Sequence, residues 1–532
     1  MVTGGVLSGL GKGVTISSIG LLLKSKGLRI SAIKIDPYLN CDAGTMNPYQ
    51  HGEVFVLDDG GEVDLDLGSY ERFLDVNLTK DNNITTGKIY QAVIQKERDG
   101  AYLGKTVQII PHITNEIKET IKKVAKKANV DVMLVEMGGT VGDMESMPFL
   151  EAVRQLSMEV GKENCLFVHT TLVPIMRTVG EQKTKPTQHS VRDLRAVGLQ
   201  PNVIIARGER PLADDIKRKL SMFCDVPVEA VISAPDTKSI YHVPGILSEQ
   251  RLPEFVMKRL GLKTRKRNTR EWDAFLGNLN SPLRETDIAI VGKYTKLADS
   301  YLSHIEALTH AGAALRTRVN IQWLESEELE KCVEPDNLKA CAGVLVPGGF
   351  GYRGITGKLA AIQFARERRV PFLGVCLGFQ LAVIEFSKNV LGLKDANSSE
   401  FDPHTLNPVI DLLPEQREIM QMGATMRLGA KEVLIEKRSL AYGIYGKGKI
   451  CERHRHRFEV NPAYLEKLTE KGMRFSGISP DQKRMEILEL SGHPFFVASQ
   501  FHPEFKSRPI RPAPLYVAFV SAALKFSGAK GF

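Results

Sequence analysis

The chain has 532 residues, which is enough for two to four domains of roughly 150 residues each. Its 43% apolar and 25% charged residues are typical of a folded globular protein and exclude a disordered or collagen-like chain. The 71 basic and 62 acidic residues leave a net charge of +9, which favours anionic partners such as nucleotides or nucleic acid.

Short β-branched runs alternate with helix-like segments along the chain, which predicts an α/β fold with parallel sheets. The predicted strands are 29–35, 130–136, 165–168, 203–206 and 230–234, followed by 287–291, 319–323, 343–346, 371–375 and 495–500. Helices are expected at 300–316 and 355–368.

A basic, polar stretch begins at residue 263 and separates the two series of strands. We therefore predict a first domain at 1–262, a linker at 263–285 and a second domain at 286–532. Such a basic run could form a nuclear-localisation or nucleic-acid patch. A charged run between domains is usually just solvated, and we expect no nucleic-acid partner.

The cysteine pattern and the apolar runs address the cellular compartment. Seven cysteines are scattered with no Cys-x-x-Cys pair, which argues against a disulfide framework or a zinc ribbon and indicates a reducing compartment. No apolar run approaches the roughly 18 to 20 residues that cross a bilayer. The N-terminus also lacks a secretory pattern. We expect a cytoplasmic protein that has no membrane partner.

A glycine-rich segment, Gly4 to Gly13, follows a very short apolar start and leads into a helix-like stretch. Glycines let backbone N–H groups converge on phosphate oxygens, and Lys12 can reach a terminal phosphate. The segment departs from the strict P-loop pattern, because Val6 replaces its first glycine and Gly13 follows Lys12. We predict a nucleoside triphosphate site, with a ligand-free turn as the alternative.

Two acidic segments are candidate ligands for a divalent cation, which usually takes one or two protein carboxylates. On a strand, Asp64-Leu65-Asp66 would place both carboxylates on one face. Glu136 ends an apolar run, at the edge where α/β sheets bind ligands. Solvated strand caps have the same pattern, so both interpretations of Asp66 and Glu136 stay open.

The segment Gly180 to Gln188 crowds two cations and several small polar residues beside a proline. This composition predicts a loop rather than regular structure. Such a loop suits a second polyphosphate, and an exposed polar turn is the alternative.

A cysteine nucleophile is predicted at Gly374-Val375-Cys376-Leu377-Gly378, which copies the nucleophile elbow with sulfur in place of oxygen. Another apolar run ends at His502 and Glu504, which would share a face if that run stays extended. Glu504 could then orient His502 as the base for Cys376. A buried, inert cysteine is the alternative.

Oxyanion donors are expected in the loop Val346 to Gly351, whose consecutive glycines can aim N–H groups at one point, with the Leu377 N–H as a second donor. Farther along, Arg453, Arg455 and Arg457 alternate with two histidines, which predicts a strand. Neighbouring guanidinium groups oppose a dication, so we favour a carboxylate-binding strand over a metal site.

Together these motifs resemble the CTP synthase family over essentially the whole chain. The first half is similar to its amidoligase domain and the second half to a class I glutamine amidotransferase. The residues that carry the resemblance, besides those already named, are 34–38, 51–54, 64–68, 136–140, 183–188, 374–380 and 502–504.

The resemblance implies that glutamine is hydrolysed at Cys376 and that ammonia passes internally to the first domain. There ATP would phosphorylate O4 of UTP, and ammonia would displace phosphate to give CTP. By the same resemblance, Lys12 and Lys34 stabilise the transferring phosphate, while Asp66 and Glu136 hold Mg²⁺.

The remaining site residues are carried over by position. ATP contacts are implied for Gly9, Leu10, Gly11, Lys12, Gly13, Val14 and Asp66, and contacts to UTP or inhibitory CTP for Ser8, Asp143, Met144, Glu145, Lys183, Thr184, Lys185, Pro186, Thr187, Gln188 and Lys219. Glutamine contacts are implied for Gly349, Leu377, Gly378, Phe379, Gln380, Glu400 and Arg457. Arg353 resembles part of a lid through which GTP activates the glutaminase.

The resemblance also implies a homotetramer that polymerises into filaments. Two other functions stay open from the residues alone. The chain could be an amidotransferase that feeds ammonia to another acceptor, or a P-loop scaffold protein with a degenerate hydrolase domain. The complete set Cys376, His502 and Glu504 argues against degeneracy.

Overall fold

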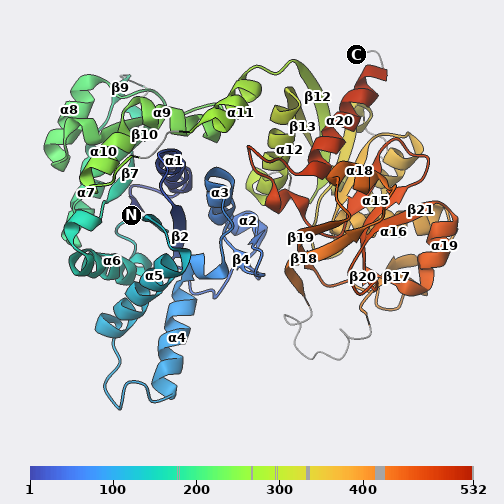
Figure 1. Ribbon diagram of the computed structural model, residues 1–532, viewed down its shortest axis with the longest axis horizontal. Helices are drawn as coiled ribbons and strands as arrows, with labels where there is room; N and C mark the ends of the chain where they lie inside the picture. Colours follow the sequence, from blue (N-terminus) through green and yellow to red (C-terminus); the bar gives the residue numbers. More distant parts are fainter. Residues whose placement is uncertain are drawn as a thin grey trace. The chain divides into compact units, whose positions relative to one another are not determined.

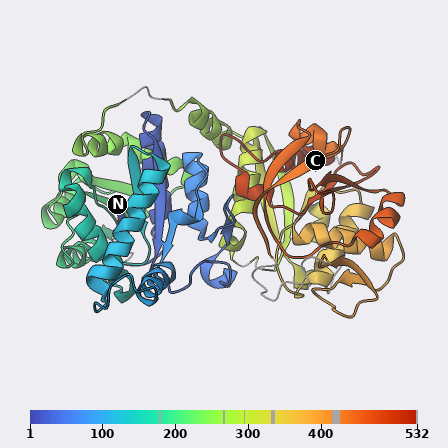
Figure 2. The ribbon, with the colours of Figure 1, turned by 60° about the horizontal axis from the view of Figure 1, so that its bottom comes forward.

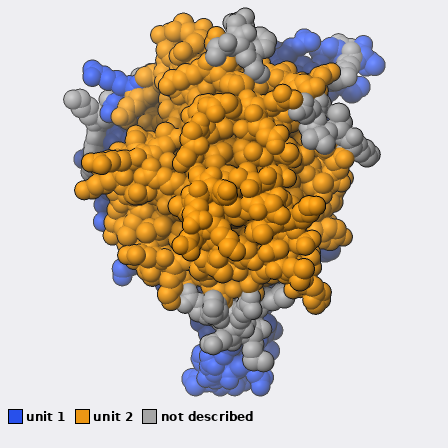
Figure 3. Space-filling view, turned by 90° about the vertical axis from the view of Figure 1, so that its right-hand side faces the viewer, with its two compact units in different colours: residues 1–45, 66–270 blue, residues 46–65, 271–532 orange. Residues whose placement is uncertain are grey.

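The computed structural model describes residues 1–176, 178, 180–264, 268–293, 295, 297–330, 336–413 and 426–529. They form two compact units (Figure 3): residues 1–45 with 66–270, and residues 46–65 with 271–532. Each unit contains a sheet covered by helices, which confirms the predicted α/β class (Figure 1). No helix among the described residues is long and apolar enough to cross a membrane.

The first unit is built on a parallel sheet of seven strands. Their order is β11 (Val231–Pro235), β10 (Val203–Gly208), β7 (Val168–Leu172), β1 (Val2–Gly4), β6 (Val132–Met137), β2 (Ile30–Asp36) and β5 (Asn83–Thr85). Strand β7 begins where the predicted strand 165–168 ends, and it continues through buried His169, Thr170 and Thr171. Their polarity hid the strand from a search for apolar runs.

Helices cover both faces of this sheet (Figure 2). Helix α1 (Lys12–Ser25) packs against α9 (Val243–Glu249) and α10 (Leu252–Arg259). Helices α4 (Thr86–Arg98), α5 (Thr114–Ala128) and α6 (Met147–Val160) bury their apolar sides in a core that includes Ile33, Ile35 and Val135. Alternate residues of β2, such as Ile33 and Ile35, therefore face this helix layer.

Two sequence predictions about local structure in this unit are wrong. Asp66 lies not on a strand but in the first turn of α3 (Leu65–Leu74), because Leu67, Tyr70 and Leu74 are spaced to bury one helix face and a carboxylate is favourable at a helix N-terminus. The predicted loop at 180–188 ends in α7 (Lys185–Ala196), because Pro186 fits the first turn of a helix.

The second unit has a nine-stranded mixed sheet. The parallel part is β13 (Thr317–Glu325), β12 (Arg284–Gly292), β14 (Gly343–Val346), β15 (Phe372–Val375) and β23 (Phe496–Ser499). The antiparallel part is β22 (Met485–Leu490), β21 (Met473–Ile478), β18 (Arg427–Ile435) and β19 (Lys449–His456). All five strands predicted in this half of the chain form the parallel part.

Two helix layers enclose this sheet. On one face α15 (Ile355–Glu367) and α16 (Leu377–Asn389) cover side chains such as Val291 and Val346. On the other face α12 (Leu302–Ala314) and α20 (Pro514–Ala529) cover Ile290 and Leu345. Successive strand residues thus alternate between two cores.

Residues 46–65 belong to the second unit although they lie within the predicted first domain. They form α2 (Pro48–His51) and a hairpin of β3 (Phe55–Val56) and β4 (Glu62–Val63). Glu53 accepts hydrogen bonds from the backbone N–H and hydroxyl of Ser303, and Asp58 pairs with Arg453 at 2.6 Å. Part of the predicted linker also folds, as α11 (Arg270–Asn280) with Trp272 buried. The domain boundaries drawn from the sequence otherwise stay a prediction.

Candidate active sites

Cys376 lies at a sharp turn between β15 and α16, where its backbone has a φ of +52°, a conformation that costs a non-glycine residue about 1–3 kcal/mol. The flanking glycines are required by close approach. A Cβ at Gly378 would lie 2.1 Å from the Val346 carbonyl oxygen, and one at Gly374 would lie 2.8 Å from the Gly378 oxygen. The turn places the thiol at the N-terminus of a helix, as in a nucleophile elbow.

His502 and Glu504 follow β23 and are both buried. Their pairing is as predicted, with 2.6 Å between His502 Nδ1 and Glu504 Oε1. The extended conformation expected for them is wrong, because Pro503 to Lys506 form a short 3-10 helix that turns Glu504 back toward His502. A proline in the first turn suits this conformation.

The electrostatics of this cluster favour the charged forms of His502 and Glu504. Burial alone would lower the pKa of His502, but the Glu504 carboxylate and Cys376 raise it to about 10. Burial raises the pKa of Glu504, but His304 and His502 bring it below its ordinary value. At neutral pH His502 is therefore an imidazolium beside a carboxylate, an arrangement that suits a thiolate nucleophile.

The predicted oxyanion loop lies against this cluster. A Cβ at Gly348 would lie 2.9 Å from His502 Cε1 and 3.5 Å from Cys376 Cβ, so only glycine fits there. Lys293 holds the loop from behind by donating to the carbonyl oxygens of Phe350, at 2.9 Å, and Gly351. The Leu377 N–H opens α16, where the first N–H groups of a helix have no intrahelical acceptor.

The predicted glutamine contacts fall into two groups. Glu400 accepts a hydrogen bond from the Gly351 N–H at 3.2 Å, and Arg457 acts electrostatically on Glu400, so these two charges border the oxyanion loop. Phe379 and Gln380 are buried instead, and the Gln380 amide donates to the Phe458 carbonyl oxygen at 3.0 Å. Glu400 and Arg457 are thus placed at the oxyanion loop, whereas the side chains of Phe379 and Gln380 are buried, and their contacts with glutamine stay a prediction.

Arg353, the predicted lid residue, is exposed in a turn before α15. Its guanidinium donates to the Lys293 carbonyl oxygen at 3.2 Å and lies 3.4 Å from Glu327. Because Lys293 also bonds the oxyanion loop, Arg353 is connected to that loop through one lysine.

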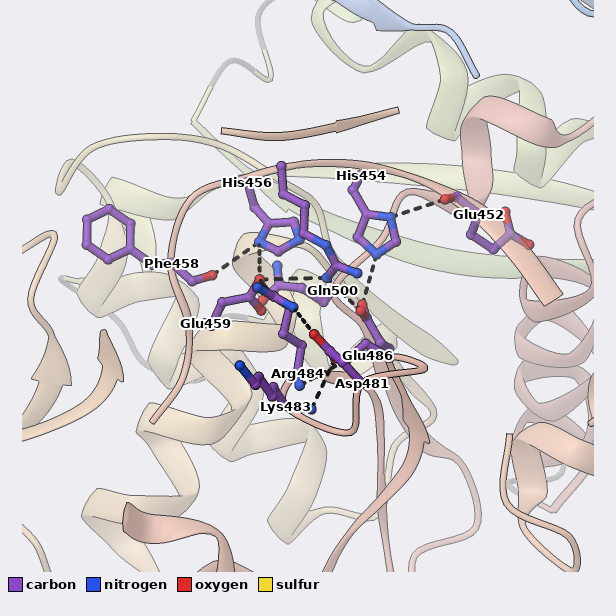
Figure 4. A network of polar contacts seen from close by, with 12 residues as sticks. Glu452, His454, His456, Phe458, Glu459, Asp481, Lys483, Arg484, Glu486 and Gln500 are labelled. Carbon is purple, nitrogen blue, oxygen red and sulfur yellow. Dashed lines mark hydrogen bonds and ion pairs between the residues drawn. The ribbon is translucent and has the colours of Figure 1, made fainter. Parts of the chain in front are cut away.

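The arginines and histidines of β19 take part in internal pairing. Arg453 pairs with Asp58 and Arg455 with Glu62, both at or below 2.7 Å, so this strand does bind carboxylates, which belong to residues 46–65. The two histidines join a buried network in which His454 Nε2 lies 2.8 Å from Glu486 (Figure 4). Across the described ranges, no three or more His, Cys, Asp and Glu are grouped to hold a metal ion.

In the first unit, the glycine-rich segment connects β1 to α1. Gly9 and Gly11 have φ values of +76° and +78° with open space around them, so glycine serves backbone conformation there. Val6 has a φ of +77°, which is rare for a β-branched residue and coincides with the position where the strict P-loop pattern has glycine. Lys12 begins α1, and its Nζ donates to the Gly139 carbonyl oxygen at 2.9 Å.

Beside this segment, several carboxylates converge on Lys34. Its Nζ contacts Asp66, lies 3.0 Å from Glu136 Oε1 and lies 4.0 Å from Asp36. Burial raises the pKa of Glu136, and burial also raises the pKa of Asp36, to about 6, against the pull of Lys34. A Cβ at Gly13 would lie 2.1 Å from Asp66 Oδ1, so this carboxylate sits directly against the start of α1.

These carboxylates fit a magnesium ion in their chemistry. Asp66 and Glu136 supply hard oxygen donors at the end of the glycine-rich segment, and Mg²⁺ typically takes one or two such ligands and completes its shell with phosphate oxygens and water. Both pair with the Lys34 ammonium, which offsets part of their negative charge.

The residues predicted to contact UTP and CTP lie in two places. Asp143, Met144 and Glu145 are exposed in a short 3-10 helix, where Asp143 accepts a hydrogen bond from the Thr140 N–H at 2.6 Å. Near the start of α7, Lys183 pairs with Glu181 at 2.5 Å, and Lys219 of α8 (Asp214–Cys224) acts on the same carboxylate.

The neighbouring polar residues at the start of α7 have structural partners. Buried Thr184 accepts from the Gln188 amide at 3.0 Å, and Thr187 donates to the Leu172 carbonyl oxygen at 3.0 Å. Lys185 and Pro186 open the helix, and Lys185 is exposed. Lysines 183, 185 and 219 are thus the members that present charge to solvent.

Comparisons with known proteins identify the family. Residues 1–262 match the family model described as CTP synthase N-terminus, and residues 296–522 match the one described as glutamine amidotransferase class-I. The chain is 59% identical to the CTP synthase of Thermococcus kodakarensis, over 98% of this chain and 98% of that protein. The chain belongs to the CTP synthase family. It is therefore a ligase that hydrolyses glutamine.

Other members of the CTP synthase family are similar over the same length. The protein of Carboxydothermus hydrogenoformans is 58% identical over 98% of each chain. Among solved structures, the Trypanosoma brucei CTPS glutaminase domain with bound acivicin is 44% identical, with a TM-score of 0.43, over 45% of this chain and 94% of that chain.

Two buried residues near the glutaminase cluster of this CTP synthase family member escaped sequence reasoning. Lys358 of α15 is fully buried, its Nζ has no hydrogen-bond partner among the described residues, and burial together with Lys293 lowers its pKa to about 7. His304 of α12 lies 3.5 Å from Glu504. The available signal was a polar residue on an otherwise apolar helix face, which does not reveal its neighbours.

Proposed function

We propose that the chain makes CTP from UTP, ATP and glutamine through two separate chemical centres. The observation that carries this proposal is the cluster of Cys376, His502 and Glu504 in one unit, together with a glycine-rich segment and its lysines in the other. Small-molecule substrates, with ATP among them, follow from the family.

In the glutaminase half, the Cys376 thiolate attacks the side-chain amide carbon of glutamine. N–H groups of the Gly348 loop and of Leu377 face the oxyanion that forms. His502 gives its proton to the leaving nitrogen, the C–N bond breaks, and ammonia departs. His502 then takes a proton from water, which attacks the thioester, releases glutamate and restores the thiolate.

In the amination half, O4 of UTP takes the γ-phosphoryl group of ATP, the bond to the β-phosphate breaks and ADP leaves. This step is needed because a carbonyl oxygen is a poor leaving group and a phosphate is a good one. Lys12 and Lys34 compensate the negative charge that spreads over the transferred group. Ammonia then attacks C4, and phosphate leaves to give CTP. The glycine-rich segment binds ATP, while Lys183, Lys185 and Lys219 bind the triphosphate of UTP or of inhibitory CTP.

Magnesium completes this centre in our proposal, held by Asp66 and Glu136 together with ATP. When bound, the ion offsets phosphate charge and orients the β and γ groups. Since both carboxylates pair with Lys34, we propose that Lys34 turns from them toward the phosphoryl group when the nucleotide arrives.

Regulation and assembly follow the same resemblance. We propose that GTP activates the glutaminase through Arg353, which reaches the oxyanion loop through Lys293. We further propose CTP inhibition through residues 143–145, a homotetramer that forms filaments, and domains at 1–262 and 286–532 joined by 263–285.

The test is the ultraviolet change as UTP becomes CTP, measured with purified chain, ATP and Mg²⁺ and with either glutamine or ammonium chloride. We expect CTP from both nitrogen sources and none without ATP. Amination of a different acceptor, with UTP left unchanged, would contradict the proposal. So would ATP hydrolysis that ignores UTP.

A further inference from the structure

His304 is placed directly behind the carboxylate that orients the base His502. It is the third residue of α12 and is buried, at 3% exposure. Its Nε2 lies 3.5 Å from Glu504 Oε1, and its Nδ1 lies 2.5 Å from the hydroxyl of Tyr516 in α20. His502, Glu504, His304 and Tyr516 therefore form a continuous row.

The partners of His304 select its tautomer. Burial holds the pKa of Tyr516 well above 10, so this phenol keeps its proton and donates it to Nδ1. Burial also lowers the pKa of His304, which keeps the imidazole neutral. With Nδ1 accepting, the ring proton is on Nε2 and points at Glu504. The opposite tautomer would set a lone pair against a carboxylate.

Glu504 depends on these two imidazoles. Its Oε1 faces both His502 and His304, whereas its Oε2 has no hydrogen-bond partner in the part of the chain that the structure describes. A buried carboxylate with few donors is expensive to keep ionised. Loss of either imidazole should therefore change its charge or its orientation.

Other charged groups act on this row from the surrounding elements. They are Lys358 of α15 on His304, His456 of β19 on His502, Glu452 of β19 near Glu504, and Glu53 and Tyr445 on Tyr516. Of these, none is recorded within hydrogen-bond distance of Glu504 among the described residues. His304 is thus the second side-chain partner of that carboxylate, which also accepts a backbone hydrogen bond.

We propose that His304 is a positioning residue of the glutaminase centre, where its imidazole, fixed by Tyr516, donates to Glu504 and keeps this carboxylate ionised and directed at His502. The inference rests on the proposed role of Cys376 as nucleophile. Without His304, Glu504 supports the His502 imidazolium less well. The imidazolium then loses its proton at a lower pH. Activity therefore begins to fall at a lower pH on the alkaline side of its pH profile, which we call the alkaline limb.

The test uses two readouts across pH: kcat/KM for glutamine hydrolysis, and the rate at which iodoacetamide alkylates Cys376, with Cys376→Ala as the background for other thiols. For His304→Leu we expect kcat about tenfold lower, the size of one hydrogen bond to a charged group, with KM within about twofold. The alkaline limb of both profiles should fall by about half a pH unit to one unit.

Two further variants separate positioning from packing. His304→Gln keeps an N–H that can reach Glu504 and should restore most of kcat and the limb. Tyr516→Phe frees the tautomer and should fall between Leu and wild type. If His304→Leu fails to fold, the Gln and Phe variants still carry the test.

His310 provides a matched control, because it lies on the same helix, is fully buried and also pairs with a hydroxyl, that of Ser507 at 2.9 Å. His310→Leu should lower the melting temperature and leave the alkaline limb of both pH profiles in place. Unchanged limbs in His304→Leu, or a Gln variant no better than Leu, would overturn the inference alone. A wild-type chain that never hydrolyses glutamine would overturn the proposed function as well.

Discussion

The two candidate centres differ in how their charges are arranged before any ligand arrives. In the second unit, Cys376 sits in a strained turn and His502 is paired to Glu504 at 2.6 Å, so the base and its carboxylate are already paired before any ligand binds. In the first unit, Lys34 pairs with Asp66 and Glu136 and Lys12 bonds a backbone carbonyl. There the Lys34 ammonium and the two carboxylates pair with one another rather than with a ligand.

This difference follows from the chemistry of the two halves. A thiolate nucleophile needs its charge balanced by the protein itself, because glutamine is neutral in its side chain. A phosphoryl-transfer site receives several negative charges with its substrate, so its lysines and carboxylates can be partners until the nucleotide and its metal replace those pairs. The glutaminase centre in the second unit is assembled before binding, and the amination centre in the first unit is completed by binding.

Removing the nucleophile should separate the centres most strongly. We expect Cys376→Ala to lower glutamine-dependent CTP formation at least a thousandfold, since the variant lacks the sulfur that forms the thioester. Ammonia-dependent formation should stay within about twofold, because it bypasses the thioester. Both rates are read from the ultraviolet change. An equal loss of both would contradict the division into two centres.

Removing a phosphate-binding lysine should impair CTP formation but spare glutamine hydrolysis. Lys12→Ala should lower CTP formation from both nitrogen sources by about a hundredfold or more, because the transferred phosphoryl loses a stabilising charge. Glutamine hydrolysis, measured as glutamate release, should persist. Lys26→Ala, on the turn after the same helix, is the control and should change little. Retained ammonia-dependent synthesis in Lys12→Ala would remove Lys12 from the centre.

Lys358 tests whether a buried cation supports the glutaminase centre around Cys376. Folding lowers the pKa of Lys358 from 10.5 to about 7. Between pH 7 and pH 10.5, Lys358 therefore carries a proton in the unfolded chain but not in the folded chain. The resulting destabilisation is complete below pH 7 and fades as pH rises to 10.5. Lys358→Met should therefore raise the free energy of unfolding at neutral pH, by about 2 kcal/mol.

The same variant should lower glutamine hydrolysis about tenfold, because the Lys358 ammonium interacts with Cys376 and can offset the negative charge of the oxyanion that forms there. Chemical denaturation and glutamate release measure the two effects, and ammonia-dependent synthesis is the control. Higher stability with unchanged hydrolysis would show that Lys358 has no part in the reaction.

The smallest expected effect concerns strain in the glycine-rich segment. Val6→Gly should raise the free energy of unfolding by about 0.5–1 kcal/mol, because glycine adopts the left-handed conformation without strain but loses more entropy on folding. Thermal unfolding measures this change. A destabilised variant would mean that the Val6 side chain contributes more than its strained backbone subtracts.

Sequence reasoning reached the fold and the nucleophile because both depend on local patterns. Apolar runs gave most of the parallel strands, although not β5, and two glycines around Cys376 indicated a turn, where a Cβ in place of either glycine's hydrogen would lie 2.1 or 2.8 Å from a backbone oxygen. The antiparallel strands β18, β21 and β22 were not predicted, because their pairing joins distant segments and their residues are mixed in polarity.

Tertiary contacts account for the other differences. Nothing in residues 46–65 indicates that their carboxylates pair with Arg453 and Arg455, hundreds of residues away. His304 and Lys358 likewise have significance only through neighbours that the fold supplies. At Asp66 and Pro186 the sequence does contain local helix signals, but the predictions for these segments were a strand and a loop.

The central claim is that nitrogen released at one centre is installed at the other within the same chain. The most direct measurement supplies glutamine labelled with ¹⁵N in its side-chain amide, with unlabelled ammonium in the buffer, and examines CTP by mass spectrometry. The account predicts that the CTP carries the ¹⁵N label. CTP without the label, formed while labelled ammonium accumulates in solution, would contradict it.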